Sequence, residues 1–524
     1  MHACPNNKAL MERTLHSSLL SATRVYTRVH PVLRACFSGL LIACGFAPMH
    51  LPGFTILGLA LLFLQLHQAS SRKVAFVAGF WSGLSTMAIG VSWIYVSIHL
   101  YGHLHPLLSA GLTLIFLMYL ALFPGLMALV YHTLRDQQSV WKACGLFSAL
   151  WMLSEYARAH FLGGFPWLMV GVSQMDTPLR HLFPLIGLYG VGFFTCLASA
   201  FLAMGLSTRR QLGVMLSVGL ILLPLSLSSL SWASFDKQPL SVGIIQANIS
   251  MQDKWNSSFF WTLMQQYHQS INELIEHTAL IVLPESAIPV PADYIHDVLD
   301  TLDREAKHVN HAILLGIPQK AEKTDYYNTM LSLGQAQGSY FKQHLVPFGE
   351  FIPDPFQHWM DFLGIPAPNL QSHPAPQDWI TVNHHKMASL ICYELAYPEL
   401  IRQQLPQAQW IVSISDGGWF GHSFAIYQML QMAQVLAIST ARFHVVANNG
   451  GLSSVIDAHG QILSSLPAFQ AGILQANIHP GIGATPWVRW GDWPSLSLCL
   501  LLIGVALLRF LNSCFNVKNK SAAQ

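Results

Sequence analysis

The chain has 524 residues, of which 52% are hydrophobic and only 10% are charged. Soluble globular domains carry about 25% charged residues, so this composition excludes a disordered chain and an ordinary soluble enzyme. The formal net charge of +2 leaves no broad basic surface for a nucleic acid. Together with a mean hydropathy of +0.40, these values predict a membrane protein.

Long apolar runs lie in two regions of the chain. A helix needs about 20 mostly apolar residues to cross the hydrocarbon core of a membrane. Seven such runs come before residue 233 and one comes after residue 492, with a more polar sequence between them. The first two runs are short, so a single re-entrant hairpin is the alternative to two spans. The predicted spans are 35–47, 54–66, 74–96, 107–131, 143–156, 182–206, 212–230 and 496–510.

The positions of Lys and Arg predict how the chain is oriented, because cytoplasmic loops are enriched in these residues. Basic groups precede the first span and follow the second, fourth, sixth and eighth, whereas the loops 49–53 and 98–106 contain neither Lys nor Arg. Both termini are therefore expected in the cytoplasm. The predicted regions are a cytoplasmic tail (1–30), a seven-span membrane domain (31–233), a soluble domain outside the cytoplasm (234–492), and an eighth span with a cytoplasmic tail (493–524).

The soluble region contains one of the eight cysteines, Cys392. In an oxidising compartment structural cysteines form disulfides, so an unpaired one is either a passive buried residue or a reactive nucleophile. The apolar run 388–391 predicts a buried strand that ends at Cys392. Nucleophiles often occupy strand ends, where backbone amides converge on the reacting carbonyl. The local sequence therefore favours a nucleophile.

A thiol nucleophile needs a base to remove its proton and a cation to stabilise the oxyanion. Glu285 follows a second predicted strand at 279–283. A third predicted strand, 311–317, precedes a turn, and in the later segment SYFKQHLVPFGEFIP the residues Lys342 and Glu350 flank an apolar turn. Each residue taken alone has a structural explanation as well, as a turn residue or a surface charge. Predicted strands and helices alternate through the region, which indicates an α/β layered domain with two sheets or one large mixed sheet.

Three motifs in this order, LPESAIP, KQHLVPFGEFIP and LICYE, resemble the Glu–Lys–Cys triad of the nitrilase superfamily. With the membrane segments, the chain resembles the apolipoprotein N-acyltransferases over nearly its whole length from about Arg34. The membrane region carries matching motifs in GVSWIYVSIHLYG and GGFPWLMVGVSQMDTPL, and TPWVRWGDWP leads into the last span. The resemblance implies a multi-pass α-helical membrane domain and a periplasmic nitrilase-like α-β-β-α sandwich.

The resemblance also implies roles for individual residues. Cys392 attacks a phospholipid acyl ester and becomes a thioester, with Glu285 as general base and Lys342 stabilising the negative charge. The amine of a diacylglyceryl-cysteine apolipoprotein then takes the acyl chain. Residues expected to support the triad or bind substrate are Glu350, Tyr393, Glu394, Trp419 and Arg442. We expect no metal or other cofactor, no nucleic acid partner, a monomer, and a location in the bacterial inner membrane.

Three other functions use parts of the same sequence. A membrane-tethered amidase or nitrilase-like hydrolase would use the same triad with water as acceptor, but it does not need the matched membrane motifs. A paralogue that binds lipoproteins without acylating them does not need an intact triad. A transporter would need ionisable residues at the bilayer midplane, and Glu155 with Arg158 is the only pair that hints at one.

Some features of the chain are less specific. The loop 351–374 is rich in aromatic residues and proline, and we expect a lid that reaches into lipid. Glu155 and Arg158 are spaced to pair with each other on one helix face. Several positions depart from the usual family pattern and are expected to alter the rim of the acceptor site. These are Asp416, Gly417, Met429, Gln434 and Val446.

Overall fold

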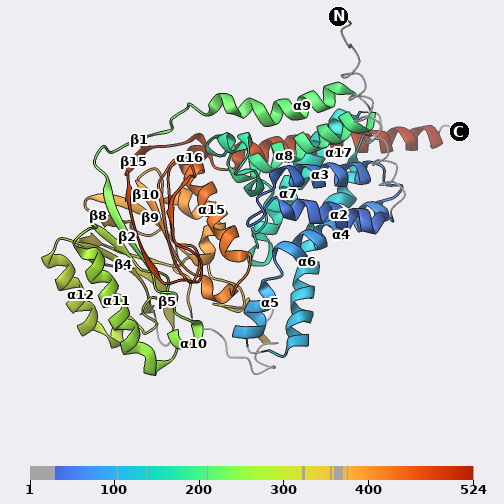
Figure 1. The fold of residues 1–524 in the computed structure, drawn as a ribbon. Helices are drawn as coiled ribbons and strands as arrows, with labels where there is room; N and C mark the ends of the chain where they lie inside the picture. Colours follow the sequence, from blue (N-terminus) through green and yellow to red (C-terminus); the bar gives the residue numbers. More distant parts are fainter. Residues whose placement is uncertain are drawn as a thin grey trace, which may run out of the picture.

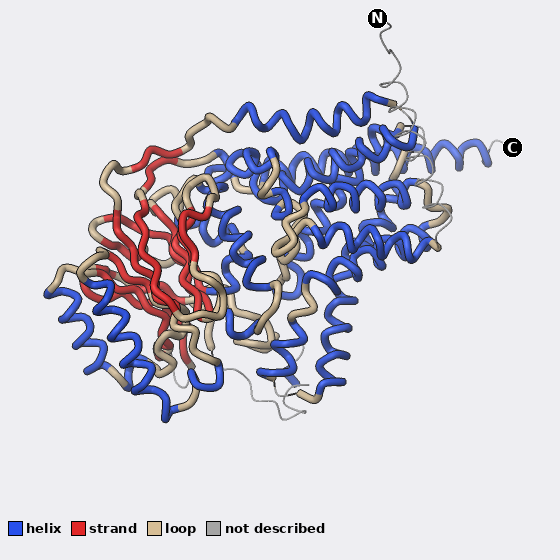
Figure 2. The backbone as a smooth tube through the Cα atoms, in the orientation of Figure 1, coloured by secondary structure: helices blue, strands red, loops and turns tan. Residues whose placement is uncertain are grey.

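The computed structural model describes residues 30–522, apart from 103, 137–138, 209, 322–324, 354–356, 359–369 and 375. A bundle of helices occupies one side of the molecule and a β-rich domain the other (Figures 1 and 2). Helix α9 (Gln211–Leu222) runs along the bundle, and the chain then enters the β-rich domain through β1 (Ala233–Phe235) (Figure 1). The predicted lid and the N-terminal tail lie largely outside the described residues.

Apolar helices form the bundle, and several of them begin with a proline. Pro31, Pro52 and Pro106 each occupy the first turn of a helix, where a missing N–H costs nothing and the fixed φ suits the helix. The helices are α2 (Pro31–Cys44), α3 (Pro52–His67), α4 (Arg72–Gly90), α5 (Ile94–Val96), η1 (Ser97–Tyr101), α6 (Pro106–Leu134), α7 (Val140–His160), η2 (Phe161–Gly163), η3 (Val172–Gln174), η4 (Pro178–Leu182), α8 (Phe183–Thr208), η5 (Leu223–Leu227) and α17 (Trp493–Ala522).

Three helical stretches of the described chain are long and apolar enough to cross a membrane: Pro106–Leu134, Pro178–Thr208 and Trp493–Phe515. A fourth is reached if α4 and the stretch Ile94–Tyr101, which bend by 62° relative to each other, count as one span. Each of the eight predicted spans overlaps a helix, but α2, α3 and α9 are shorter than the three long stretches. The chain is therefore a membrane protein by its helices, and the count of eight spans stays a prediction.

Close packing holds the bundle together. Gly79 and Gly83 of α4 lie against Pro124 of α6, where an added Cβ would come within 2.4 Å of the Pro124 carbonyl oxygen or closer still to its ring. Small residues of this kind let helix backbones approach closely inside a membrane. At the end of α3, the Arg135 guanidinium donates hydrogen bonds to the carbonyls of His67 and Ala69, which satisfies oxygens that a helix leaves free.

Two stacked sheets form the core of the other domain. One has the strand order β13-β12-β11-β10-β9-β8-β6, and the other has the order β14-β2-β3-β4-β5-β7. The strands are β2 (Leu240–Gln246), β3 (Leu280–Val282), β4 (Ala312–Lys320), β5 (Tyr326–Gly334), β6 (Ala336–Gln337), β7 (Ser339–Phe341), β8 (Ile380–Val382), β9 (His385–Ile391), β10 (Trp410–Asp416), β11 (His444–Asn449), β12 (Ser454–Ile456), β13 (Ile462–Ser465) and β14 (Gly472–Ile478). A third pairing joins β1 to β15 (Gly481–Gly483).

Successive side chains of a strand point to opposite faces of its sheet, so neighbouring residues pack against different layers. In β3, Leu280 and Val282 belong to the core between the sheets, whereas Ile281 packs with the helices outside. These outer helices are α11 (Phe260–Ile275) and α12 (His296–His308), at the edge of the molecule farthest from the bundle (Figure 1). The other sheet is covered by α14 (Pro398–Gln404) and α15 (Ala425–Thr440). The domain is thus a four-layered α-β-β-α sandwich with two sheets.

Helix α15 joins the sandwich to the bundle, because it lies between the sheet and α8 (Figure 1). Two glutamines of α15 make the polar contacts. Gln428 accepts a hydrogen bond from the Trp167 indole at 2.6 Å and donates to the Gly90 carbonyl at 3.0 Å. Gln431 accepts the backbone N–H of Ala47 at 3.0 Å. The sandwich is therefore anchored to loops at one end of the bundle.

Candidate active site

Glu285, Lys342 and Cys392 converge between the two sheets. Glu285 follows β3 and Lys342 follows β7. Strand β3 is parallel to β4, and β5 is antiparallel to both β4 and β7, so β3 and β7 run in the same direction. Cys392 follows β9 of the facing sheet. Three strand ends, from two sheets, therefore bring together the residues that the sequence singled out.

The three side chains make a buried polar cluster. Lys342 Nζ lies 3.3 Å from Glu285 Oε1 and 2.7 Å from Glu350 Oε1. The Cys392 thiol lies beside the Glu285 carboxylate, which acts on the pKa of the thiol. Lys342 has no exposed surface, and Glu285 and Cys392 are 5% and 6% exposed. Charged groups this deeply buried persist only when they are paired, and here one ammonium faces two carboxylates.

The protonation states follow from this packing. Burial alone would lower the pKa of Lys342, but Glu350, Glu285 and Cys392 outweigh it and raise the pKa of Lys342. Burial and the Glu285 carboxylate raise the pKa of the Cys392 thiol well above its ordinary value of 9.0, with Lys342 acting in the opposite direction. The resting cluster thus holds a thiol and an ammonium, and the thiol proton must pass to a neighbouring base during attack.

The backbone is unusual at two of these positions. Cys392 has φ of +55°, and Ser286, directly after Glu285, has φ of +47°. Residues other than glycine seldom occupy this left-handed region, and such strain is concentrated at functional sites. Cys392 therefore begins the turn that follows β9 in an unusual backbone conformation.

Glu394 ties the nucleophile's turn to the segment that carries Lys342. Its carboxylate accepts the backbone N–H groups of Gln343 at 2.7 Å, His344 at 3.0 Å and Ile391 at 2.8 Å. The Tyr340 hydroxyl donates to both of its oxygens at 3.1 Å. Burial raises the pKa of Glu394 to about 7, although these hydrogen bonds oppose the shift. The predicted supporting residue is therefore a clamp between two strand ends.

Glu350 and Asn328 are the other polar residues that surround Lys342 and Glu285. Glu350 accepts the backbone N–H of Val346 at 2.8 Å as well as the ammonium of Lys342. Asn328 of β5 donates to Glu285 Oε1 at 2.8 Å and to Glu350 Oε1 at 3.3 Å. The sequence did not reveal Asn328, because nothing in its neighbourhood distinguishes it from any polar residue in a strand. Its one amide holds both carboxylates in place.

Tyr393, the predicted supporting residue after the nucleophile, contacts the helical bundle. Its hydroxyl donates to the Gly164 carbonyl at 3.1 Å, and that of Tyr397 donates to the carbonyls of Gly163 and Gly164 at 3.1 Å. The Trp167 ring stacks beside Tyr393, with ring centroids 6.4 Å apart. The loop after α7 therefore covers the turn that carries Cys392.

The two predicted substrate-binding residues lie in very different places. Trp419 is 38% exposed, and its ring meets Tyr101 of η1 at 5.1 Å. Arg442 is buried, and its guanidinium donates to the backbone carbonyls of Ala408 at 3.0 Å and Gly483 at 2.7 Å. Arg442 precedes the amino end of β11, which runs parallel to β9. It thus lies at the end of the sheet opposite Cys392, where its contacts are structural.

The departures from the family pattern do not form an exposed rim. Met429 and Val446 are 3% and 4% exposed, and Gln434 donates to the Gly460 carbonyl at 2.8 Å. Met429 and Val446 are therefore packed inside the domain, whereas Gln434 is half-buried, and an effect of these departures on the acceptor site stays a prediction. Gly417 is also buried, and its N–H donates to Asn448 at 2.7 Å.

Glu155 and Arg158 were expected to pair, but the ion pairs of the described chain do not include this one. Glu155 accepts the N–H groups of the Trp151 indole at 3.0 Å and of the Val170 backbone at 2.9 Å. Arg158 donates to the Phe165 carbonyl at 3.0 Å. Both side chains hold the loop that follows α7, so their role is structural.

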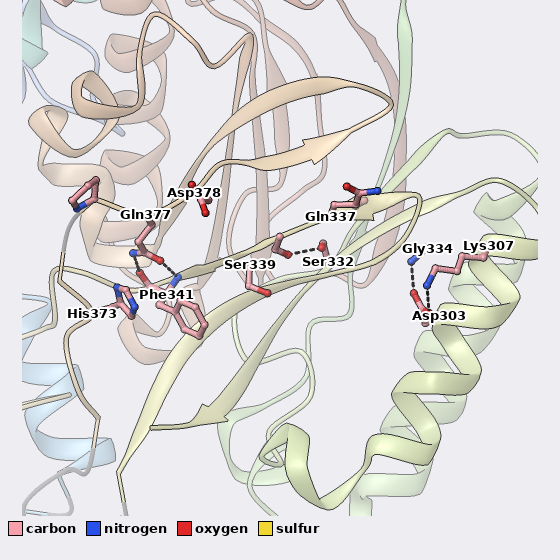
Figure 3. A pocket seen from close by; sticks show the side chains of 13 residues that line it. Asp303, Lys307, Ser332, Gly334, Gln337, Ser339, Phe341, His373, Gln377 and Asp378 are labelled. Atoms are coloured by element: carbon pink, nitrogen blue, oxygen red, sulfur yellow. Dashed lines mark hydrogen bonds and ion pairs between the residues drawn. The ribbon is translucent and has the colours of Figure 1, made fainter. Parts of the chain in front are cut away.

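An open polar hollow lies elsewhere on the sandwich, between α12 and the β6–β7 region (Figure 3). Asp303 and Lys307 form an ion pair at its edge, and Asp303 also accepts the Gly334 N–H at 2.8 Å. Neither Glu285 nor Cys392 lines it, so it is separate from the candidate active site. In the part of the chain that the structure describes, no group of three or more His, Cys, Asp or Glu residues could hold a metal ion.

Comparison with known proteins identifies both halves of the chain. Residues 38–201 match the family model of the apolipoprotein N-acyltransferase N-terminal domain, and residues 241–486 match the carbon-nitrogen hydrolase family. The second match confirms the nitrilase-like fold expected for the sandwich.

Curated relatives cover almost the whole chain. Proteins named apolipoprotein N-acyltransferase from Methylococcus capsulatus, Azotobacter vinelandii and Nitrosomonas europaea are 33%, 34% and 35% identical, over 91%, 91% and 92% of this chain and 96%, 95% and 97% of their own lengths. An amidase from Nesterenkonia sp. is a solved structure that matches 48% of this chain and 92% of its own, with 14% identity and a TM-score of 0.34. On the sequence matches, the chain belongs to the apolipoprotein N-acyltransferase family.

Proposed function

We propose that this membrane acyltransferase moves an acyl chain from a phospholipid to the N-terminal amine of a diacylglyceryl-cysteine apolipoprotein, with Cys392 as the covalent carrier. The observation that carries the proposal is the buried contact of Lys342 with Glu285 and of Glu285 with Cys392, in a chain of this family. A nucleophile, a base and a fixed cation are what acyl transfer through a covalent intermediate requires.

In the first step the Cys392 thiol passes its proton to Glu285 as the sulfur attacks the ester carbonyl carbon. The oxyanion of the tetrahedral intermediate is stabilised by the Lys342 ammonium, which is already in place and needs no reorganisation. When the carbon–oxygen bond breaks, Glu285 returns the proton to the lysophospholipid oxygen. Cys392 then carries the acyl chain as a thioester.

In the second step the α-amine of the apolipoprotein attacks the thioester. Glu285 takes a proton from the attacking nitrogen, and the carbon–sulfur bond breaks to give an amide. The proton held by Glu285 then restores the Cys392 thiol. The same base and cation serve both steps, so the reaction follows ping-pong kinetics.

The bundle supports a topology with the sandwich on the periplasmic face of the inner membrane and both termini in the cytoplasm. Arg135, together with Arg72 at the start of α4, marks the end of the bundle at which α3 finishes. The sandwich is bonded to the other end, through Ala47 and Gly164. Basic loops away from the sandwich are what the positive-inside rule requires for a periplasmic active site.

We further propose eight spans, with seven in residues 31–233 and the last in 493–524, and a catalytic domain in 234–492. Helices that are short by themselves, such as α2 and α3, cross with help from flanking loops or local thinning of the bilayer. A phospholipid donor and a lipoprotein acceptor both present their reactive groups at the membrane surface, where the sandwich lies. A monomer suffices, because the described chain alone supplies the whole triad.

The full-length protein in mixed micelles with dipalmitoyl phosphatidylethanolamine and a synthetic diacylglyceryl-cysteine peptide tests the proposal. Mass spectrometry of the peptide should show one added palmitoyl group on its α-amine. Cys392→Ala should give no product, whereas Cys144→Ala, which changes a buried cysteine of α7, should keep it. Free palmitate with an unmodified peptide would show a hydrolase instead, and a folded protein with no product would show a non-acylating binder.

A further inference from the structure

A second buried ion pair lies directly behind Glu285. Lys254 ends the short helix α10 (Met251–Lys254), and Asp416 ends β10. The Lys254 ammonium contacts Asp416 Oδ2, and their side chains are 0% and 2% exposed. Taking a charge out of water is costly unless a partner compensates it. A pair so deeply buried, next to the reacting groups, is therefore a feature that needs an explanation.

Both members of the pair also contact Glu285. Lys254 Nζ lies 3.3 Å from the Glu285 carbonyl oxygen. The backbone N–H of Asp416 donates to Glu285 Oε2 at 3.0 Å. Lys254 thus holds the main chain of Glu285, while Asp416 holds its carboxylate on the side opposite Lys342.

The Asp416 carboxylate fixes its own backbone at the same time. Its Oδ1 accepts the Gly418 N–H at 2.9 Å and the Asn449 side-chain amide at 3.2 Å, and its Oδ2 accepts Lys254. With all these contacts made, the peptide that donates to Glu285 has little freedom to turn away. The contacts therefore set the orientation of the Glu285 carboxylate.

We propose that Lys254 and Asp416 are positioning residues that hold the Glu285 carboxylate toward Cys392 and, by neutralising each other, add no net charge beside it. The inference rests on the proposed function, in which Glu285 takes the Cys392 proton. Glu285 is faced by Lys342, Cys392 and, through Lys342, Glu350, and it is backed by the pair. Neither Lys254 nor Asp416 touches the reacting atoms, so both act through Glu285.

The test uses three variants of the full-length enzyme in dipalmitoyl phosphatidylethanolamine micelles. The readout is the rate of Cys392 thioester formation measured across pH. Asp416→Asn keeps the shape and the backbone N–H but leaves the Lys254 charge uncompensated. Lys254→Met leaves the Asp416 carboxylate uncompensated. Asp416→Asn combined with Lys254→Met removes both charges.

The two single variants should move the acid limb of the pH–rate profile in opposite directions. An extra positive charge weakens Glu285 as a base and shifts the limb to lower pH, and an extra negative charge shifts it to higher pH. We expect about one pH unit, which is about a tenfold change in rate on the limb. The double variant should return the limb to that of the parent enzyme. Lys307→Met removes the lysine of the exposed pair with Asp303 and should leave the profile unchanged.

If the pair were merely structural, the single variants would yield less folded enzyme but would leave the acid limb of the pH–rate profile unshifted. That result would overturn the inference. A double variant whose limb stays as displaced as that of a single variant would overturn it too. If Lys254→Met fails to fold, the acid limb of the pH–rate profile of Asp416→Asn, a nearly isosteric change, still tests the inference. Glu285→Gln separates the two proposals: a normal thioester rate there refutes the role of Glu285 itself, whereas a lost rate with unshifted limbs refutes only the role of the pair.

Discussion

The carboxylate of Glu394 accepts the backbone N–H of Gln343 at 2.7 Å, across the gap between the two sheets. Gln343 directly follows Lys342, and Glu394 is two residues beyond Cys392. This single contact therefore joins the strand end that carries the cation to the one that carries the nucleophile. Because the same carboxylate also accepts the backbone N–H of Ile391 at 2.8 Å, it links the residue before Cys392 to the residue after Lys342.

Glu394→Gln should loosen this connection. A glutamine side chain has one acceptor oxygen, so its NH₂ group must face a backbone N–H at Gln343 or at Ile391. A buried donor left without a partner costs about 1–3 kcal/mol, and we expect a lower unfolding temperature together with slower thioester formation. Glu273→Gln, at an exposed position of α11, is the control. Unchanged stability and rate in Glu394→Gln would contradict the clamp.

Lys342→Arg should fail although the charge is kept. Lys342 is completely buried between Glu285 and Glu350, and a planar guanidinium is too wide for a site built around a compact ammonium. Loss of an oxyanion-stabilising group costs about 10²–10³ in rate, and we expect a loss of that size in thioester formation. Lys386→Arg, where the lysine lies 4.0 Å from the centroid of the Trp379 ring, should keep the rate. A Lys342→Arg variant with the normal rate would show that Lys342 does not stabilise the oxyanion.

The sequence predicts where two members of the triad lie in the fold, because Glu285 and Cys392 each follow an apolar run that forms a strand. Lys342 follows β7, which the sequence did not predict, since the predicted third strand, 311–317, is β4. The runs that end before Glu285 and at Cys392 form β3 and β9, and these strands belong to the two facing sheets. Asn328 and Lys254 were not foreseen, because their roles arise from contacts between segments distant in the sequence. Nothing local marks a polar residue in β5 or in the short α10 as part of a site.

Other features of the structure depend on geometry that the sequence does not carry. The resemblance assigns Arg442 to substrate binding, but it cannot say at which end of a sheet the residue lies, and strand direction puts Arg442 at the end opposite Cys392. Of the two arrangements left open, two sheets or one mixed sheet, the structure has two sheets, and which strands pair is not encoded in the composition. Apolar length also fails to anticipate the 62° bend after α4, so it predicts helices better than it counts spans.

Acid should destabilise the sandwich through His444. Burial lowers the pKa of His444 from 6.5 to about 4, while its ring contacts Ser413 Oγ at 2.9 Å. Between these values the unfolded chain binds a proton that the folded one does not, so stability is complete above pH 6.5 and falls as the pH drops toward 4.

His444→Gln removes this titration. The unfolding temperature of the variant, relative to its own value at pH 7.5, should fall less between pH 6.5 and 4.5 than that of the parent. The exposed His277→Gln should behave like the parent, and so report any general effect of losing a histidine. An equal acid sensitivity in His444→Gln and the parent would show that His444 does not make this contribution.

Membrane orientation can be read from two single cysteines. Asp300→Cys and Lys73→Cys are both at exposed positions, and Cys514→Ser removes the exposed thiol of α17 from the background. A membrane-impermeant maleimide should label position 300 in cells with a permeabilised outer membrane, and position 73 only after the inner membrane is also opened. Basic residues on the cytoplasmic side are the reason. Labelling of position 73 first would invert the proposed topology.

The most direct test of the central claim is the mass of the peptide that contains Cys392 after the enzyme meets phospholipid alone. With dipalmitoyl phosphatidylethanolamine and no acceptor, this peptide should gain one palmitoyl group, which hydroxylamine removes because it is a thioester. The adduct should disappear when a diacylglyceryl-cysteine peptide is added and should be absent in Glu285→Gln. An acyl group on another residue, or continued transfer to the acceptor by Cys392→Ala, would contradict Cys392 as the carrier.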